Sequence, residues 1–334
     1  MGRMNLLSSY INNASGAVQG FCIVRSVTVK SNIKGADYLD FTLADAGGEV
    51  NAKLWDYSTA AHGTYQVGDI IKVRGTINVW KDSEQLKIDR IRHKTEADDI
   101  DMSAIVTSSP VSGDTVFKKL YDAAGSFGDN DLARLTQYLL RTHRDRMEKY
   151  PAALKLHHAE RGGLMFHTGT MLEVAKKLVE VYKPYYPELS EDLIYCGVIL
   201  HDIAKTEELE VSELGIATAY TVRGQLLGHI SMGVSMVEQA AAELQIPEEL
   251  VMLVSHILLS HHGQPDFGSP KFPMFPEAEI VSEIDMLDAR MFEMFDALKG
   301  VEVGQFTERQ WALDNRLLYR HGHGLVTMNN EPKE

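Results

Sequence analysis

Residues 191–205 have the sequence EDLIYCGVILHDIAK, in which an apolar run ends in the adjacent pair His201-Asp202. The whole stretch predicts one helix. Adjacent residues of a helix point about 100° apart, so the two side chains cannot share one narrow stripe. They can hold the same metal ion only in the core of a bundle that several helices approach. The stretch therefore predicts a helical domain with a polar centre.

Five more candidate metal ligands lie on or at the ends of other predicted helices: His167, His229, His261, His262 and Asp285. Eight of the 13 histidines fall between residues 157 and 262. Histidines mixed with carboxylates suit hard-to-borderline divalent metals. One ion would need only His167, His201, Asp202 and Asp285 with waters. Seven candidates therefore predict two ions that share Asp202 as a bridge.

Two divalent ions about 3.5–4 Å apart suit in-line displacement at phosphorus. The ligand set thus favours phosphodiester hydrolysis with Asp202 as a catalytic residue. The mixture of histidine and aspartate favours Mn²⁺, with Co²⁺ or Fe²⁺ as alternatives. The competing interpretation of any single histidine is a hydrogen-bonded core residue. His256 is interpreted in that way, because it lies five and six residues before the His261-His262 pair and out of phase with it.

Several basic side chains near these ligands are candidates for contact with a phosphate. Lys205 lies four residues after His201 on the same helical face, so it is predicted to stabilise charge in the transition state. The alternative role of Lys205 is a favourable interaction with the helix dipole. The predicted substrate-binding residues of this region are His157, His158, Arg161 and Arg223. The alternative for the first three of these is a cap and surface cluster.

Residues 17–92 show the period-two alternation of β-strands, punctuated by Gly and Asp. The predicted strands cover residues 17–30, 38–43, 50–55, 68–79 and 85–91. Residues 57–65, between the third and fourth strands, predict a short helix or a loop. Five strands with an insert at that place indicate a small Greek-key barrel of the oligonucleotide-binding (OB) type.

Aromatic and basic side chains on these strands suit single-stranded nucleic acid, because bases stack on aromatic rings while cations follow the phosphates. Tyr38 and Trp80 are the preferred stacking positions. The other aromatic candidates are Phe21, Phe41 and Trp55, and the basic candidates are Lys53, Lys72, Arg74, Lys81 and Lys87. Most strand aromatics belong to the core, so we expect only about two of the five to contact nucleic acid.

The sequence divides into a barrel domain at 1–95, an acidic and then Ser/Thr-rich linker at 96–113, and an all-helical domain at 114–328. In the last part, Asp114 is predicted to cap the first helix, and Asp129 or Asn130 the second. The predicted helices cover residues 115–124, 130–149, 167–182, 191–205, 228–244, 247–261 and 277–298.

Composition excludes several classes of protein. The net charge of −14 is divided into +3 for residues 1–95 (12 basic, 9 acidic) and −17 for the remainder (21 basic, 38 acidic). This balance disfavours a general DNA-coating protein. No run approaches the ~18 apolar residues of a membrane helix, so no membrane association is expected. The two cysteines, Cys22 and Cys196, exclude a disulfide framework and a Cys-based zinc site, which suits the cytoplasm.

The pattern His167, His201-Asp202, Asp285 resembles the HD superfamily of metal-dependent phosphohydrolases, and HDIAK at 201–205 is similar to the central motif of that superfamily. Some HD branches carry extra histidines like His229, His261 and His262, which implies a binuclear centre. An OB module followed by an HD domain resembles the YhaM-type 3′→5′ exoribonucleases of bacteria. The segments that carry this resemblance are HHAERGGL at 157–164, SHHG at 260–263, FGSP at 267–270 and IDMLDA at 284–289.

The resemblance implies an exonuclease that degrades single-stranded RNA from the 3′ end to nucleoside monophosphates. Single-stranded DNA is an alternative substrate that the sequence leaves open. A second hypothesis is an HD phosphohydrolase of a small nucleotide, in which the barrel regulates or assembles the enzyme. A third is a nucleic-acid-binding adaptor with an inert HD fold. Apolar residues near the C-terminus predict a homo-oligomer: Phe306, Trp311, Leu317 and Tyr319.

Overall fold

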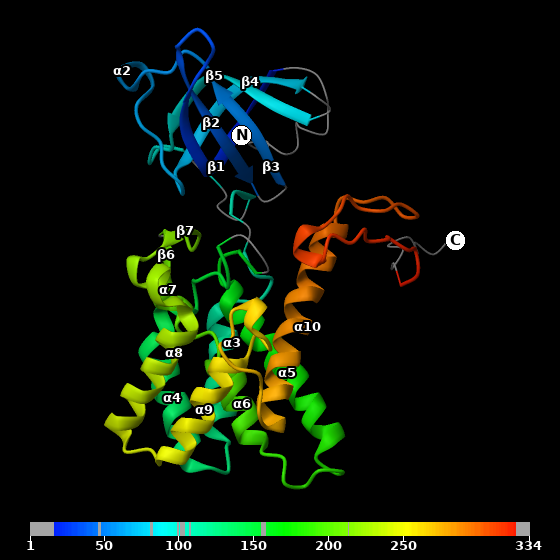
Figure 1. The fold of residues 1–334 in the computed structure, drawn as a ribbon. Helices are drawn as coiled ribbons and strands as arrows, with labels where there is room; N and C mark the ends of the chain where they lie inside the picture. Colours follow the sequence, from blue (N-terminus) through cyan, green and yellow to red (C-terminus); the bar gives the residue numbers. More distant parts are fainter. Residues whose placement is uncertain are drawn as a thin grey trace, which may run out of the picture.

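The structure is a computed structural model that describes residues 17–45, 48–80, 83–98, 100, 104–106, 108–154, 158–212 and 214–324. A β-barrel lies at one end of a helical bundle, and a connecting segment joins the two (Figure 1). The predicted multidomain class, an all-β barrel followed by a helical domain, is therefore confirmed.

The barrel contains five strands: β1 (Ala17–Ser31), β2 (Asp37–Asp45), β3 (Gly48–Leu54), β4 (Ile70–Trp80) and β5 (Ser83–His93). The strands close in the order β1-β2-β3-β5-β4. β3 and β5 are parallel, and the other neighbouring pairs are antiparallel. The short helix α2 (Thr59–His62) lies between β3 and β4. This order and insert confirm an OB-type barrel.

The interior of the barrel follows from the period of two along each strand. Cys22 and Val24 of β1 point into the core together with Phe41 of β2 and Ile71 of β4. Phe21, one position away from Cys22, belongs to a different cluster outside the barrel core. Phe21 and Phe41 are both buried, so neither offers an exposed ring for base stacking.

The bundle is built from α3 (Gly113–Gly125), α4 (Asn130–Met147), α5 (Gly163–Tyr182), α6 (Glu191–Leu200), α7 (Lys205–Glu208), α8 (Val222–Leu244), α9 (Glu248–Ser260) and α10 (Pro276–Leu298). Its core is one contiguous apolar cluster to which α3 to α6 and α8 to α10 all contribute. Figure 1 shows α6 in the middle of the bundle, with α5, α9 and α10 around it.

The stretch 191–205 departs from the single predicted helix. α6 ends at Leu200, a turn follows, and the short helix α7 begins at Lys205. A hairpin that the sequence did not predict follows α7, with strands β6 (Leu209–Val211) and β7 (Ala217–Tyr220). The helical domain therefore contains one small β-element, which lies at the end of the bundle that faces the barrel (Figure 1).

Helix caps decide where two of the helices begin. The Asp129 side chain accepts hydrogen bonds from the backbone N–H groups of Asp131 and Leu132, as predicted for α4. The cap of α3 is Ser112, so the prediction of Asp114 was wrong. Asp114 instead forms ion pairs with Lys118 and Arg144, which an acidic residue in the first turn can do while it also favours the helix dipole.

An apolar cluster joins the barrel to the bundle. Phe21 and Ile23 on the outer face of β1 pack with Ile105 and Val106 of the connecting segment and with Ile216 of the β6–β7 hairpin. All five residues are buried. This cluster, hereafter the domain joint, brings the hairpin against the barrel.

The remaining described elements are the 3₁₀ helices η2 (Pro265–Phe267) and η3 (Trp311–Leu313). An arm beyond α10 folds back on itself through bridges that pair Phe306 with Tyr319 and Gln310 with Arg316. Across the ranges described, no helix is both long and apolar enough to cross a membrane.

Candidate metal centre

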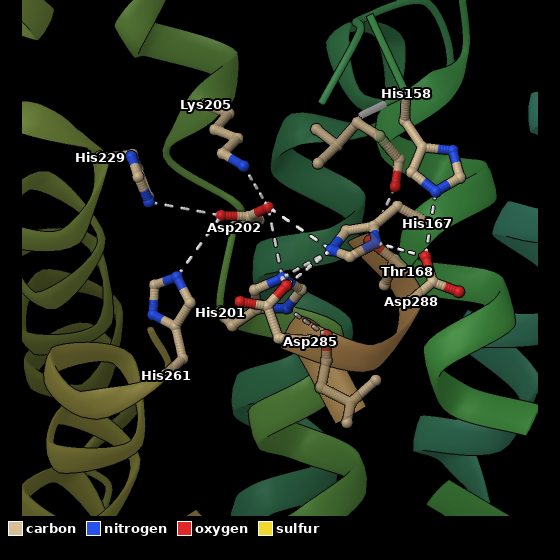
Figure 2. Close-up of polar contacts among 12 residues, drawn as sticks. His158, His167, Thr168, His201, Asp202, Lys205, His229, His261, Asp285 and Asp288 are labelled. Carbon is tan, nitrogen blue, oxygen red and sulfur yellow. Dashed lines mark hydrogen bonds and ion pairs between the residues drawn. The ribbon is translucent and has the colours of Figure 1, made fainter. Parts of the chain in front are cut away.

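Five elements place the predicted ligands around one point in the bundle. His167 comes from α5, His201 and Asp202 from the turn after α6, His229 from α8, and Asp285 from α10. His261 and His262 follow the last residue of α9. Figure 2 shows Asp202 in the middle, with the imidazoles of His167, His201, His229 and His261 turned toward it.

One group of donors lies on the α5 and α10 side of Asp202. Nε2 of His167 is 3.3 Å from Nε2 of His201 and 3.1 Å from Oδ1 of Asp285. Oδ2 of Asp202 is 3.2 Å from Nε2 of His201 and 3.9 Å from Nε2 of His167. Donor atoms of His167, His201 and Asp202 all lie within 4.8 Å of one another. Two imidazole nitrogens and two carboxylate oxygens thus converge on one point.

A second group lies on the α8 and α9 side. Oδ1 of Asp202 is 3.5 Å from Nε2 of His229 and 3.7 Å from Nε2 of His261. These three buried atoms have no hydrogen-bond partner among the described residues. Buried polar atoms without partners are costly and rare in folded proteins. His262 completes this group, whose donor atoms also lie within 4.8 Å of one another.

The unpartnered atoms fit a divalent cation. Neutral imidazole nitrogens and carboxylate oxygens are ligands of first-row divalent metals, and a cation would satisfy all three atoms at once. Asp202 belongs to both groups and contributes a different oxygen to each. The residues present therefore suit two cations that share one carboxylate.

The turn after α6 allows consecutive residues to face the same centre. The His201 N–H donates to the Gly197 carbonyl, as in an α-helix, but the Ile203 N–H donates to the carbonyl only three residues back. The Lys205 N–H does the same with Asp202. This tighter winding replaces the 100° step of a continuous α-helix, and it explains why the helix predicted for 191–205 is interrupted at the pair.

Four of the predicted histidine ligands are held by a hydrogen bond at the outer nitrogen. Nδ1 of His201 donates to the Val198 carbonyl at 2.8 Å, and Nδ1 of His261 donates to the Leu258 carbonyl at 2.7 Å. These bonds place the proton on Nδ1 and leave Nε2 as the acceptor that faces Asp202. Such outer contacts fix the tautomer and the ring orientation of metal-binding histidines.

Carboxylates hold the other two histidines, and the sequence did not reveal them. Asp288 accepts from Nδ1 of His167 at 2.7 Å. Glu208 accepts from Nδ1 of His229 at 3.1 Å and from the His229 backbone N–H at 2.8 Å. The available signal for Asp288 was its position three residues after Asp285, which places both on one helical face. No comparable signal marked Glu208, because its contact crosses from α7 to α8.

The charges of Asp202 and His261 match the forms that bind a cation, whereas His167 is protonated in the cation-free chain. Burial alone would raise the pKa of Asp202, but Lys205 and His201 outweigh it and hold that pKa well below its usual range. Burial also lowers the pKa of His261, so its imidazole is neutral. Burial acts in the same direction at His167, yet hydrogen bonds with Asp285 and Asp288 raise its pKa to about 9. In the cation-free chain His167 thus carries one positive charge between these two carboxylates, and a cation bound at this position would replace the proton on its Nε2.

The structure places the remaining predicted residues in different surroundings. Nζ of Lys205 is 2.6 Å from Oδ2 of Asp202, so the cation faces the centre while it pairs with a ligand. His158 is buried, and its Nε2 donates to Asp288 at 3.0 Å. Arg161 is exposed. Arg223 forms an ion pair with Glu207 at the surface, and His157 lies outside the described residues.

Two aromatic residues of the barrel form an accessible pair. The rings of Tyr38 and Trp55 pack with centroids 4.5 Å apart and planes tilted by 32°. Nζ of Lys53 lies 5.5 and 5.6 Å from the two ring centroids. Trp55 is exposed and Tyr38 is half-buried. Trp80 belongs to β4, but its side chain lies outside the part of the chain that the structure describes.

The fold and this constellation define a class of protein in which an OB-type barrel precedes an HD domain. A family model for the HD domain matches residues 165–290. The 3′-5′ exoribonuclease YhaM of Bacillus subtilis (strain 168) is 38% identical over 303 residues, which cover 91% of this chain and 94% of that protein. The chain belongs to the family of this exoribonuclease.

Similar solved structures match over shorter stretches. The second OB-fold domain of replication protein A from Methanococcus maripaludis covers 27% of this chain and 90% of its own length, with 20% identity and a TM-score of 0.20. A replication protein A heterotrimer bound to ssDNA covers 24% of this chain and 59% of its own, with 14% identity and a TM-score of 0.21.

Proposed function

We propose that this chain is a divalent-cation-dependent 3′→5′ exonuclease that hydrolyses single-stranded RNA to nucleoside monophosphates. The observation that carries the proposal is the convergence of Asp202 Oδ1, His229 Nε2 and His261 Nε2, three buried atoms with no described hydrogen-bond partner. Membership of a family with a 3′-5′ exoribonuclease supports the direction and the substrate.

Asp202 would hold both cations, and the other ligands would divide between the two positions. His167, His201 and Asp285 serve the first position, and His229, His261 and His262 serve the second. When bound, such cations supply positive charge beside a phosphodiester and make an attached water more acidic. We favour Mn²⁺ for this mixture of nitrogen and oxygen donors, with Co²⁺ or Fe²⁺ as alternatives.

Side chains of the protein supply the remaining tasks. The buried ammonium of Lys205 balances the charge of Asp202, and we propose that it also faces the scissile phosphate and offsets charge that develops there. Arg161 and Arg223, which are exposed, would contact phosphates of the strand, and His157 remains a candidate for the same role, whereas the buried His158 is engaged by Asp288. No covalent intermediate is required.

The barrel would hold the strand whose end enters the helical domain. The pair Tyr38 and Trp55 offers a surface for base stacking, and Lys53 beside it offers a charge for the backbone. Stacking of this kind contributes about 1–3 kcal/mol per base. Trp80 remains a predicted contact. We also propose that the chain forms a homo-oligomer and works in the cytoplasm. The assembly is proposed because four apolar side chains of the arm beyond α10 are exposed: Phe306, Trp311, Leu317 and Tyr319.

A timed digestion of 5′-labelled single-stranded RNA and DNA tests the function, with Mn²⁺, Mg²⁺ or a chelator present. We expect a ladder that shortens from the 3′ end, release of nucleoside monophosphates, and no reaction with chelator. Asp202→Ala and Asp202→Asn should abolish hydrolysis because both cation positions lose the shared ligand, yet they should still bind RNA. Asp145→Ala, at an exposed carboxylate of α4, is the control and should retain full activity.

Three results would contradict the proposal. Turnover by the Asp202 variants would show that the metal centre takes no part in the reaction. Hydrolysis of free nucleotides without any RNA ladder would indicate a small-nucleotide phosphohydrolase. A purified protein that takes up no Mn, Fe or Co after incubation with these ions would indicate a binding protein with an inert HD fold.

A further inference from the structure

The outer face of β4 and β5 carries two cross-strand pairs of positively charged side chains. Lys72 lies directly opposite Arg92, and Arg74 lies directly opposite Arg90 in the antiparallel register. The two pairs share one face because residues two positions apart on a strand point the same way. Like charges placed directly opposite each other destabilise a sheet. These pairs therefore lower the stability of the barrel, and neutral residues at the same positions would make it more stable.

The described residues compensate only part of this charge. Arg92 forms two hydrogen bonds with Asp98, at 2.6 and 2.7 Å. No ion pair or hydrogen bond of the described chain engages the side chain of Arg74 or Arg90, and both are exposed. The four cations line a surface hollow of about 490 Å³ together with Gln19 and His62, and Asp89 is the one acidic residue among the described residues that line it.

Phe21 contacts the pair Lys72 and Arg92 and connects this pair to the domain joint. Nζ of Lys72 lies 5.0 Å from the centroid of the Phe21 ring, and the guanidinium carbon of Arg92 lies 5.7 Å from it. Phe21 is itself buried in the apolar cluster that contains Ile216 of the β6–β7 hairpin. The basic hollow thus begins where the barrel meets the helical domain.

We propose that this basic face of β4 and β5 binds the phosphate backbone of single-stranded RNA, as a path separate from the pair formed by Tyr38 of β2 and Trp55, which directly follows β3. Two free guanidinium groups in a hollow suit phosphate oxygens, which arginine binds with two parallel hydrogen bonds. No Phe, Tyr or Trp lies among the described residues that line the hollow, so we expect contacts here to be mainly with phosphates. This inference rests on the proposed function only for the identity of the nucleic acid.

The acidic helical domain of a second copy is the other partner that a basic face could attract. RNA is favoured because the hollow adjoins the joint that leads into the helical domain of the same chain. A strand that crosses the hollow is thereby directed toward the domain that contains the metal centre. The test separates these two partners.

The full-length variant Arg74→Gln/Arg90→Gln tests the proposal by fluorescence anisotropy. The probe is an RNA of about 16 nucleotides, long enough to cross one OB fold, and a chelator blocks hydrolysis. Across about 50–200 mM salt, the slope of log affinity against log salt should become shallower by about 1.4, because each of two lost single-strand contacts contributes about 0.7. Affinity at the lowest salt should fall roughly 10-fold.

Lys176→Gln/Lys177→Gln is the matched control, since it removes two charges from α5 and should change neither affinity nor slope. The melting temperature of the barrel variant should stay equal or rise, because the repulsion between opposed arginines is removed. Hydrolysis of a dinucleotide, too short to reach both sites, should remain at the wild-type rate.

An unchanged slope and affinity in a folded Arg74→Gln/Arg90→Gln variant would overturn the proposal. If the sedimentation coefficient changed instead, the face would bind a second copy rather than RNA. Because binding is measured without turnover, a wild-type chain that binds RNA but does not cleave it would refute the proposed function and leave this inference standing.

Discussion

Asp288 shows how much of the centre depends on residues that hold a predicted ligand without belonging to the predicted ligand set. Its Oδ2 accepts from Nδ1 of His167 and from Nε2 of His158. His158 packs against Phe292 with ring centroids 4.1 Å apart, so the position of this imidazole is fixed as well. A chain of contacts from His158 through Asp288 therefore orients the His167 ring, whose Nε2 faces Asp285 and Asp202.

We predict that Asp288→Asn weakens divalent-metal binding by about 10- to 100-fold, the usual effect of losing an outer partner of a metal-binding histidine. Asparagine keeps the shape of the side chain but removes the charge that favours a fixed His167. Titration calorimetry with Mn²⁺ measures the affinity directly. Asp296→Asn, an exposed position on the same helix that pairs with Lys299, is the control. Equal affinities for both variants and the wild type would exclude a positioning role for Asp288.

Residue types and spacing indicated the ligand candidates but not their surroundings. His201-Asp202 and the pair His261-His262 are recognisable because adjacent polar residues at the ends of apolar helices are unusual. His158 looked equally suited to a phosphate contact, and only the fold shows that it is buried against Asp288. Outer contacts of this kind join elements distant in sequence, so no local pattern can reveal them.

At the scale of elements, the breaks in helices position the centre as much as the helices do. α8 is interrupted at Gly228, whose φ of 70° and ψ of 157° are not helical. This conformation belongs to a region that only glycine adopts readily. The break turns the His229 backbone N–H toward Glu208, which also holds the imidazole. Pattern analysis predicted the part of α8 after Gly228, because apolar periodicity does not register a single residue of unusual backbone.

We predict that Gly228→Ala costs about 1–3 kcal/mol of unfolding free energy, the cost of forcing a side chain into this region. Space is not the cause, since the nearest atom to an added Cβ is a Glu208 oxygen at 3.9 Å. The strain should also displace His229 and weaken metal binding. Gly300→Ala, where nothing lies within 4 Å of the added Cβ and φ is not positive, is the control. Chemical denaturation and metal titration measure both effects. A Gly228→Ala protein as stable as the control would contradict this account of the break.

The alternation of apolar and polar residues made the strands of the barrel predictable. The β6–β7 hairpin was not predicted. Each strand of the barrel buries alternate residues, and that pattern is visible in the sequence. The strands of the hairpin contain only three and four residues, too few to show a period. Its place is set by contacts with the barrel at Ile216, which are long-range and therefore invisible to local analysis.

At the scale of the whole molecule, one segment contacts the barrel and also contributes side chains to the metal centre. Residues 205–229 begin with Lys205 at the metal centre, continue through Glu208 into the hairpin, and end at His229. Between these points, Ile216 packs into the domain joint with Phe21 of the barrel. The barrel is thus attached to the same segment that supplies three side chains to the centre.

We predict that Ile216→Ala separates binding of long RNA from chemistry. Loss of a buried aliphatic side chain costs about 2–5 kcal/mol in a packed core, so the joint should loosen. The barrel would then no longer hold a strand in a fixed relation to the metal centre. The KM for an RNA of about 16 nucleotides should rise, while kcat/KM for a dinucleotide should stay at the wild-type value. Val222→Ala, at an exposed position where α8 begins, is the control.

Initial rates on the two substrates distinguish the joint from a direct effect on the centre. If Ile216→Ala lowered kcat on the dinucleotide as much as on the long RNA, the hairpin would act through Lys205, Glu208 or His229 rather than through the barrel. Metal affinity gives the independent measurement, because a disturbed Glu208 weakens the hold on His229. Unchanged metal affinity together with a raised KM for long RNA alone would place the effect in the relation between the two domains.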